Sequence, residues 1–281
     1  MMNRADFIMN KADKQFLSAI CNILSNGVWD ENPRPKWADG TPAYSKFVTQ
    51  YMEEYDISKD EFPITTIKPT AWKTGIREMF WIYQEQSNDL DIARNKYGIN
   101  WWDEWDVGDN TIGYRYGHTV KRFDLMNKLL NDIQNNPYGR RHIISLWQEE
   151  EFIEETVGLN PCAFQTLWSV RDEYLDCTLI QRSNDVIAAY NINNVQYVAL
   201  MMMVAHHCGL KPGKFVRFVQ NIHIYDRHIP IAEKFLDRNI SYKQPKLIFN
   251  PKSNNFYDFT IDDFNIINYE PCENVNIEIA I

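Results

Sequence analysis

A cysteine and an arginine stand at matching ends of two extended segments in this sequence. Cys162 precedes the run Phe164–Val170, in which every second side chain falls on one face. The polar segment Arg171–Glu173 is short enough to turn the chain, and the alternating run Leu175–Leu179 returns toward Arg182. Because adjacent antiparallel strands bring the same end of a hairpin together, we expect Cys162 to lie close to Arg182.

This proximity would give the two residues a chemical role. A thiol becomes a strong nucleophile when it ionises, and a nearby guanidinium favours the thiolate. The pair Arg182-Ser183 also offers the forked donor and the hydroxyl of a phosphate clamp. The alternative is that Cys162 is a small core residue and that the Arg-Ser-Asn-Asp string is only a polar strand end.

These residues, taken together, resemble the signature of the thymidylate synthase family. The signature comprises Pro161-Cys162, Gln181-Arg182-Ser183-Asn184-Asp185, Asn193 and His223-Ile224-Tyr225. The resemblance extends from about Phe16 to Ile281 and is closest to the form found in some low-GC Gram-positive bacteria and their phages. It implies one catalytic domain over residues 1–281, of the α/β (α+β) class. In that fold a large, mostly mixed β-sheet is packed by helices, and two sheets meet in a homodimer.

The resemblance also implies a reaction. The expected activity is the reductive methylation of dUMP to dTMP, in which 5,10-methylenetetrahydrofolate gives the one-carbon unit and the hydride and becomes dihydrofolate. Uracil C5 is a poor nucleophile, but addition of the Cys162 thiolate at C6 turns C5 into an enolate carbon that can attack the one-carbon unit. No metal is expected.

Three further residues would complete this chemistry. Glu78 lies in an apolar helical stretch, where an acid is either on the solvated face or buried with a raised pKa. The resemblance implies that Glu78 handles protons and that Tyr116 lies near pyrimidine C5. The amide of Asn193 can donate to O4 and accept from N3–H, a pattern that fits uracil rather than cytosine.

The remaining site residues follow from the resemblance alone. Residues matching those that bind the nucleotide are Arg34, Arg140, Arg141, Arg182, Ser183, Asp185, Asn193, His223 and Tyr225. Among them, Arg140 and Arg141 are expected to cross the dimer interface to the partner's phosphate site. The folate is expected to contact Trp102, Trp105, Asp185 and the tail around Ala280, which closes over the ligands with its free carboxylate.

The elements that must position these residues can be read from the hydrophobic pattern. Helices are predicted over residues 14–25, from about 70 to 83, over 191–207 and over 229–237. Strands are predicted over 62–67, 143–147 and 215–225, the last of which places His223 and Tyr225 on one face. A turn at residues 135–139 delivers Arg140 and Arg141 to the head of a strand.

Composition narrows the class of protein. The formal net charge of −9 argues against a general binder of nucleic acids or membrane surfaces. The five cysteines form no CxxC pair and no metal-ligand spacing, and no apolar leader follows Met1. The longest apolar run, near residues 198–205, is too short to span a bilayer. A cytoplasmic protein without a membrane segment is therefore expected.

Two rival functions remain. A dUMP hydroxymethylase of the same family would begin with the same thiolate addition but end with attack by water. A homologue without turnover would bind only nucleotide or RNA. The sequence departs from the common family pattern at Trp101, Ala163, Ala189-Tyr190-Asn191 and Gln220-Asn221, all expected near the ligands.

Overall fold

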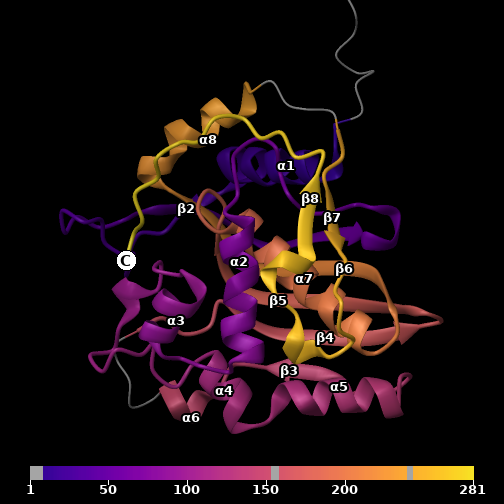
Figure 1. Cartoon of the computed structure of the whole chain (residues 1–281). Coiled ribbons are helices and arrows are strands. Elements are labelled where there is room, and N and C mark those ends of the chain that lie inside the picture. Colours follow the sequence, from indigo (N-terminus) through magenta and orange to yellow (C-terminus); the bar gives the residue numbers. More distant parts are fainter. Residues whose placement is uncertain (1–8, 153–157, 239–242) are drawn as a thin grey trace, which may run out of the picture.

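A computed structural model describes residues 9–152, 158–238 and 243–281 of the chain (Figure 1). Its centre is a six-stranded sheet in the order β1-β2-β6-β5-β4-β3. The strands are β1 (Val28–Trp29), β2 (Ser45–Asp56), β3 (Ile143–Ser145), β4 (Ala163–Arg171), β5 (Tyr174–Asp185) and β6 (Lys211–Tyr225). Only the β5–β6 pair is parallel, so the sheet is mixed, as predicted.

The register of the sheet gathers the signature residues at one edge. The start of β4 pairs with the end of β5, where Ala163 faces Gln181. The end of β5 runs beside the end of β6, where Asp185 is in register with His223. The predicted hairpin is therefore confirmed, and the thiol-bearing segment, Arg182 and His223 share one end of the sheet.

Helices cover one face of this sheet. Helices α1 (Lys11–Asn26) and α7 (Tyr190–His207) pack directly on its strands, and α8 (Ile229–Leu236) lies against α1 and β6. The other helices are α2 (Trp72–Met79), α3 (Leu90–Tyr97), α4 (Gly117–Arg122), α5 (Leu125–Asn135) and α6 (Glu149–Phe152), and a small second sheet pairs β7 (Lys246–Phe249) with β8 (Phe264–Ile267). The helices predicted at residues 14–25, 191–207 and 229–237 are thus present within a few residues.

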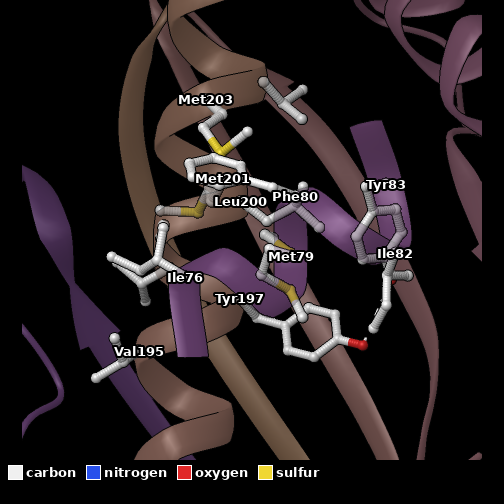
Figure 2. Packing of buried hydrophobic residues seen from close by; sticks show 14 of the residues in the cluster. Ile76, Met79, Phe80, Ile82, Tyr83, Val195, Tyr197, Leu200, Met201 and Met203 are labelled. Atoms are coloured by element: carbon white, nitrogen blue, oxygen red, sulfur yellow. Dashed lines mark hydrogen bonds between the residues drawn. The ribbon is translucent and has the colours of Figure 1, made fainter. Parts of the chain in front are cut away.

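The main core lies between α2 and α7 (Figure 2). Ile76, Met79 and Tyr197 are buried there, and Met201 and Met203 of α7 are buried in the same cluster. Beyond Met79 the helix widens into a π-helical turn, Phe80–Gln84. Such widened turns often occur beside functional sites.

The strand predicted over residues 62–67 is wrong. Thr65 and Thr66 are buried, but their hydroxyl groups both donate to the carboxylate of Asp13 in α1, and Thr66 N–H donates to it as well. The β-branched run is therefore held by a buried acid instead of a neighbouring strand. Burial raises the pKa of Asp13, while these donors oppose the rise.

Candidate active site

One cavity of about 420 Å³ lies at the signature edge of the sheet. Its walls come from the segment before α2, from α2 itself, from the tryptophan-rich loop at residues 101–105, from the start of α7 and from the C-terminal tail. The lining includes Lys68, Glu78, Trp101, Trp102, Trp105, Tyr116, Cys162, Asn193, Gln196 and Ile279. The nucleophile, the acid, the tyrosine and the amide selected from the sequence therefore face the same space.

Arg182 holds the loop that carries Cys162. The backbone N–H of Arg182 donates to Cys162 O at 2.9 Å, which fixes the start of β4 against β5. Its guanidinium donates to Pro161 O at 3.1 Å and to Asn160 O at 2.7 Å. The predicted proximity of Cys162 and Arg182 is confirmed, and the arginine orients the thiol through the backbone carbonyls that precede it.

The charge on Arg182 does not by itself ionise Cys162. Burial raises the pKa of the Cys162 thiol, while the nearby charges of Arg182 and Arg34 lower it, and burial is the larger effect. The expectation that the guanidinium favours the thiolate is correct in direction, but the desolvation of the sulfur outweighs it. Burial therefore favours the neutral form of the Cys162 thiol.

Glu78 is buried, which decides between its two sequence readings. Its two carboxylate oxygens accept hydrogen bonds from the indole nitrogens of Trp101 at 2.7 Å and Trp102 at 3.1 Å. Burial raises the pKa of Glu78 to about 7, and the donors Trp102, Trp101 and Gln196 limit the rise. A carboxyl group with such a pKa can both take up and release a proton near neutrality.

Tyr116 joins the tryptophan-rich loop to Cys162. Its hydroxyl oxygen accepts the backbone N–H of Cys162 at 3.1 Å, and its ring meets that of Trp102 edge-on at 5.2 Å. Its backbone has φ +49°, a strained conformation for a tyrosine. The next residue must be glycine, because a Cβ at Gly117 would lie 2.1 Å from Ser87 O.

The side-chain amide of Asn193 already has protein partners. Its oxygen accepts from Gln181 and from Asn184, both at 3.0 Å, and its nitrogen donates to Gln196 at 2.9 Å. From the sequence, this oxygen is expected to accept a hydrogen bond from pyrimidine N3–H. In the structure, both of its lone pairs are engaged, so a donor is what Asn193 offers to the cavity.

The end of β5 and the end of β6 carry the next group of selected residues. Asp185 uses one carboxylate oxygen to accept from the backbone N–H groups of Ile187 at 2.8 Å and Ala188 at 3.2 Å, and so fixes the turn into α7. The rings of His223 and Tyr225 meet edge-on at 5.0 Å, on one face of β6 as predicted. Burial lowers the pKa of His223, which favours the neutral imidazole.

The arginines selected for phosphate binding fall into two groups. Arg34 is exposed in the loop before β2, yet its charge acts on both Cys162 and Tyr225, so it belongs to the signature edge. Arg140 and Arg141 are exposed and line a separate hollow of about 530 Å³ with Tyr138. Within one chain they are not part of the wall around Cys162.

The C-terminal tail reaches the cavity and is tied to the Arg34 loop. Ile279 is part of the cavity wall. Ile281 exchanges two backbone hydrogen bonds with Lys36, at 2.6 and 2.9 Å, and the Glu278 carboxylate accepts from Arg227. Ala280, selected from the sequence, lies between Ile279, which lines the cavity, and Ile281, which is hydrogen-bonded to Lys36.

The contacts of three cavity residues were not predicted from the sequence. Trp101 was placed in the tryptophan-rich stretch expected beside the folate and noted as a departure from the family pattern, but its indole donates to Glu78. Gln196 lies one helical turn after Asn193, a spacing that signalled a shared helix face. Lys68 is buried and donates to Ile187 O; burial lowers its pKa to about 8, although the Asp185 charge opposes the shift.

Two further observations concern the described residues as a group. They contain no cluster of three or more His, Cys, Asp or Glu side chains placed to hold a metal ion. No helix in the described part of the chain is long and apolar enough to cross a membrane.

Comparisons with known proteins agree with this geometry. The model of the family described as Thymidylate synthase matches residues 14–281. The chain is 51% identical over 271 residues to the thymidylate synthase of Lactococcus lactis subsp. lactis (strain IL1403), covering 94% of this chain and 97% of that one. It is 50% identical over 278 residues to the thymidylate synthase of Streptococcus thermophilus (strain ATCC BAA-491 / LMD-9), with the same coverage of each chain.

A solved structure gives the same result. The thermostable thymidylate synthase A from Bacillus subtilis superposes with a TM-score of 0.89 at 37% identity, covering 96% of this chain and 99% of that one. The fold and site define an enzyme of the methyltransferase class. The chain belongs to the thymidylate synthase family, whose members methylate deoxyuridylate with methylenetetrahydrofolate as co-substrate.

Proposed function

We propose that this methyltransferase converts dUMP to dTMP through a covalent bond between Cys162 Sγ and pyrimidine C6. One observation carries the proposal: Cys162 and the buried acid Glu78 face a single cavity large enough for a stacked nucleotide and pterin. Burial raises the pKa of the half-buried Cys162 thiol, so a nearby positive charge would favour the reactive thiolate. The substrate phosphate, once held by Arg34, Arg182 and Ser183, would bring both arginines and the nucleotide to the thiol.

The Cys162 thiolate adds to C6. The C5 enolate then attacks the methylene carbon of methylenetetrahydrofolate, which gives up one of its two bonds to folate nitrogen. A base removes the C5 proton, and the folate amine leaves. A hydride from the folate then reduces the exocyclic methylene, and the thiolate departs. The products are dTMP and dihydrofolate.

Each proposed step has residues suited to it. Glu78, with a pKa of about 7, is the proton-handling group, and Tyr116, whose hydroxyl already lies at the Cys162 backbone, is the group proposed near C5. Asn193 donates to O4, where negative charge develops. His223 and Tyr225 are proposed to bind the sugar hydroxyl.

The folate is proposed to stack against the tryptophan loop. Trp102 and Trp105 supply flat faces at the cavity wall, and Asp185 is proposed to accept a hydrogen bond from the pterin. The tail around Ala280, with Ile279 in the wall, is proposed to exclude water after the folate amine has left. Water exclusion separates this activity from the rival hydroxymethylase, in which water takes the place of hydride.

We infer a homodimer that uses the uncovered face of the sheet. Met52, Phe218 and Ile180 follow one another across β2, β6 and β5 in register on that face. Met52 is 65% exposed in the single chain. Such a row of apolar side chains is typical of an interface between sheets. Arg140 and Arg141, which do not reach their own cavity, are proposed to supply the partner's phosphate site.

The domain and compartment proposals have separate support. The two core clusters draw buried residues from Ala12 to Phe264, which supports one catalytic domain over residues 1–281. Cys21, Cys162, Cys177 and Cys208 are free thiols, which supports a reducing, cytoplasmic compartment. The net charge of −9 argues against nucleic acid as a partner, whereas a few local arginines can still hold an anionic nucleotide.

The test follows both products of one reaction. The protein is mixed with dUMP and methylenetetrahydrofolate, dihydrofolate is followed by its absorbance, and the nucleotide is identified by mass. Thymidylate and dihydrofolate in equal amounts are expected. Hydroxymethyl-deoxyuridylate without dihydrofolate would establish the rival enzyme, and nucleotide binding without any product would establish the homologue without turnover.

A matched pair of variants tests the covalent step. With fluorinated dUMP and methylenetetrahydrofolate, intact mass should rise and the label should map to the Cys162 peptide. Cys162→Ser should gain no mass, whereas Cys208→Ser, at another half-buried thiol, should label like the wild type. Labelling of Cys162→Ser would contradict the proposed nucleophile.

A further inference from the structure

A chain of side-chain hydrogen bonds runs from the interior of the sheet to the acid in the cavity. Arg217 Nη1 donates to Gln181 Oε1 at 3.2 Å, and Gln181 Nε2 donates to Asn193 Oδ1 at 3.0 Å. Asn193 Nδ2 donates to Gln196 Oε1 at 2.9 Å, which leaves the NH₂ group of Gln196 as the donor that limits the pKa rise of Glu78 in the same cavity. Three amides in series therefore connect a buried cation with a buried acid, and all three point the same way.

We call this series of side chains, from Arg217 through Gln181, Asn193 and Gln196 to Glu78, the relay. Its direction is fixed at the Arg217 end. A guanidinium can only donate, so the oxygen of Gln181 must face Arg217 and its NH₂ must face Asn193. Arg217 cannot turn away, because its Nε lies 2.7 Å from the Glu53 carboxylate and its guanidinium stacks on the ring of Tyr190 at 4.2 Å. Arg217 and Glu53 are both fully buried as side chains.

The same direction is enforced at the acidic end. The indole N–H groups of Trp101 and Trp102 can only donate, so both oxygens of Glu78 act as acceptors. An ionised Glu78 also requires the NH₂ group of Gln196 rather than its oxygen. Reversal of the amides would place an oxygen against the Glu78 carboxylate, an arrangement that only a protonated Glu78 can satisfy.

The relay determines what Asn193 shows to the pyrimidine. Its oxygen is occupied by Gln181 and Asn184, and one of its two N–H bonds is directed to Gln196. The second N–H is left for the ligand in the cavity. Uracil presents an acceptor at O4, whereas cytosine presents a donor at N4, so this orientation favours uracil.

We propose that Arg217, Gln181 and Gln196 are positioning residues whose directed relay selects uracil at Asn193 and presents a donor to Glu78. The inference rests on the proposed function for its substrate. The charged group at its far end, Arg217, is buried inside the fold and is not one of the residues that line the cavity, so it would act on specificity through the amides.

The other titratable groups around Glu78 ionise at higher pH, so the titration of Glu78 can be distinguished from theirs. Burial raises the pKa values of Tyr116 and Tyr197 well above their ordinary range, so both are neutral where Glu78 titrates. Lys68, in the same cavity, has a pKa of about 8 because of burial, and burial raises that of Cys162. These groups act on the alkaline side, so the acidic limb of activity reports Glu78.

The decisive variant is Gln181→Glu, with Gln181→Met as its matched control. A carboxylate at position 181 accepts from Arg217 and also requires a donor from Asn193. The amide of Asn193 therefore turns and shows its oxygen to the pyrimidine, and the amide of Asn184 turns with it to offer its Oδ1 to the new Asn193 donor. Methionine has a similar volume and removes the bond without reversing it, because Asn184 still donates to Asn193. Circular dichroism first establishes that both variants are folded.

Two readouts follow. The ratio of kcat/KM for dUMP over dCMP should fall at least about tenfold in Gln181→Glu, the scale of leaving one buried polar contact mismatched. The ratio should change much less in Gln181→Met. The acidic limb should move up by about one pH unit in Gln181→Glu, because the reversed relay loses a donor to the charged form of Glu78.

A titration without substrates makes the test independent of turnover. The indole N–H resonances of Trp101 and Trp102, assigned with Trp→Phe variants, should shift as Glu78 ionises. The pH midpoint of this shift should rise in Gln181→Glu, although position 181 lies two hydrogen bonds away from Gln196. The midpoint should also rise in Gln196→Met, which removes the amide donor to Glu78 but leaves Asn193 oriented. Gln196→Met should therefore keep its preference for dUMP.

The outcomes separate the two proposals. Failure of the wild type to make thymidylate would reject the proposed function, while the indole titration would still test the relay. An unchanged indole midpoint in Gln181→Glu, or in Gln196→Met if Gln181→Glu does not fold, would overturn the relay. An unchanged nucleotide ratio in folded Gln181→Glu would overturn its role in specificity.

Discussion

Two buried glutamates of this protein have opposite surroundings. Glu53, on β2, lies against the Arg217 guanidinium and accepts from Tyr55, Tyr190 and Asn194. Glu78, on α2, has only neutral donors, namely two indoles and an amide, and burial raises its pKa to about 7.

The difference teaches what separates a structural acid from a reactive one. A full positive charge on Arg217, 2.7 Å from the Glu53 carboxylate, offsets the cost of burying that carboxylate. Neutral donors compensate only part of that cost at Glu78, so its two protonation states are close in free energy near neutral pH. A proton can therefore be moved at Glu78 with little change in the surrounding structure.

The largest expected effect is on turnover. Glu78→Gln should lower kcat by about 10²–10⁴-fold, the usual contribution of a general acid or base, while the protein stays folded and binds dUMP. Steady-state kinetics and nucleotide binding measure the two properties. Glu85→Gln changes a nearby acid that pairs with Lys96 outside the cavity and should leave kcat unchanged. A loss below tenfold in Glu78→Gln would assign proton transfer to another group.

Substitution of Glu53 is expected to lower the free energy of unfolding. Glu53→Ala leaves the Arg217 charge buried without its partner, which should cost about 3–5 kcal/mol of unfolding free energy in urea. Glu54→Ala, at the next position, breaks only the exposed pair with Lys214 and should cost at most about 1 kcal/mol.

A double variant sharpens this result. Replacement of both partners, Glu53→Leu with Arg217→Met, should recover most of the stability that the single change removes. Similar losses for Glu53→Ala and Glu54→Ala would contradict the structural role of the buried pair.

The third effect is a pH dependence of stability from Glu78. Because the folded pKa of about 7 lies above the ordinary 4.5, the folded protein binds this proton more tightly than the unfolded chain does. The contribution is fully present below pH 4.5 and is lost as the pH rises through 7. Wild type should therefore lose up to about 3 kcal/mol relative to Glu78→Gln over this window, by urea unfolding at several pH values. A parallel pH dependence in the two proteins would show that Glu78 titrates normally.

The smallest effect concerns the indole that the sequence argument overlooked. Trp101→Phe removes one donor to the charged Glu78, so its pKa should rise and the acidic limb of kcat/KM should move up by about half to one unit. Trp29→Phe changes an exposed tryptophan of β1 and should leave the limb in place. If both variants share the wild-type profile, Trp101 has no influence on the acid.

The sequence predicted best what depends on local pattern. Alternation over residues 164–179 was sufficient to predict the hairpin that brings Cys162 to Arg182, and helical spacing was sufficient for α7. The run at 62–67 shows the limit of the same reasoning. Its β-branched residues favour a strand, but Asp13, about fifty positions away, accepts from both threonines.

The environment of the acids could not be predicted in this way. Whether Glu78 is solvated or buried depends on how α2 packs against the loop at 101–105 and against α7, which no local pattern records. Glu53 and Arg217 are separated by 164 positions and meet only because β2 and β6 pair with Glu53 opposite Arg217. Charges brought together by strand register leave no signal in either strand alone.

The tie between the C-terminal tail and the Arg34 loop has a consequence for how the site is assembled. Lys36 and Ile281 meet through two backbone hydrogen bonds, and Ala38 meets Glu278 across 240 positions of chain. Closing so long a loop costs conformational entropy that few contacts at the tail return. This corner should form late in folding and open first in the native state. Hydrogen exchange at Ile281 should therefore be faster than at Leu179 in the central strand β5, which can remain intact while the site repeatedly opens and closes.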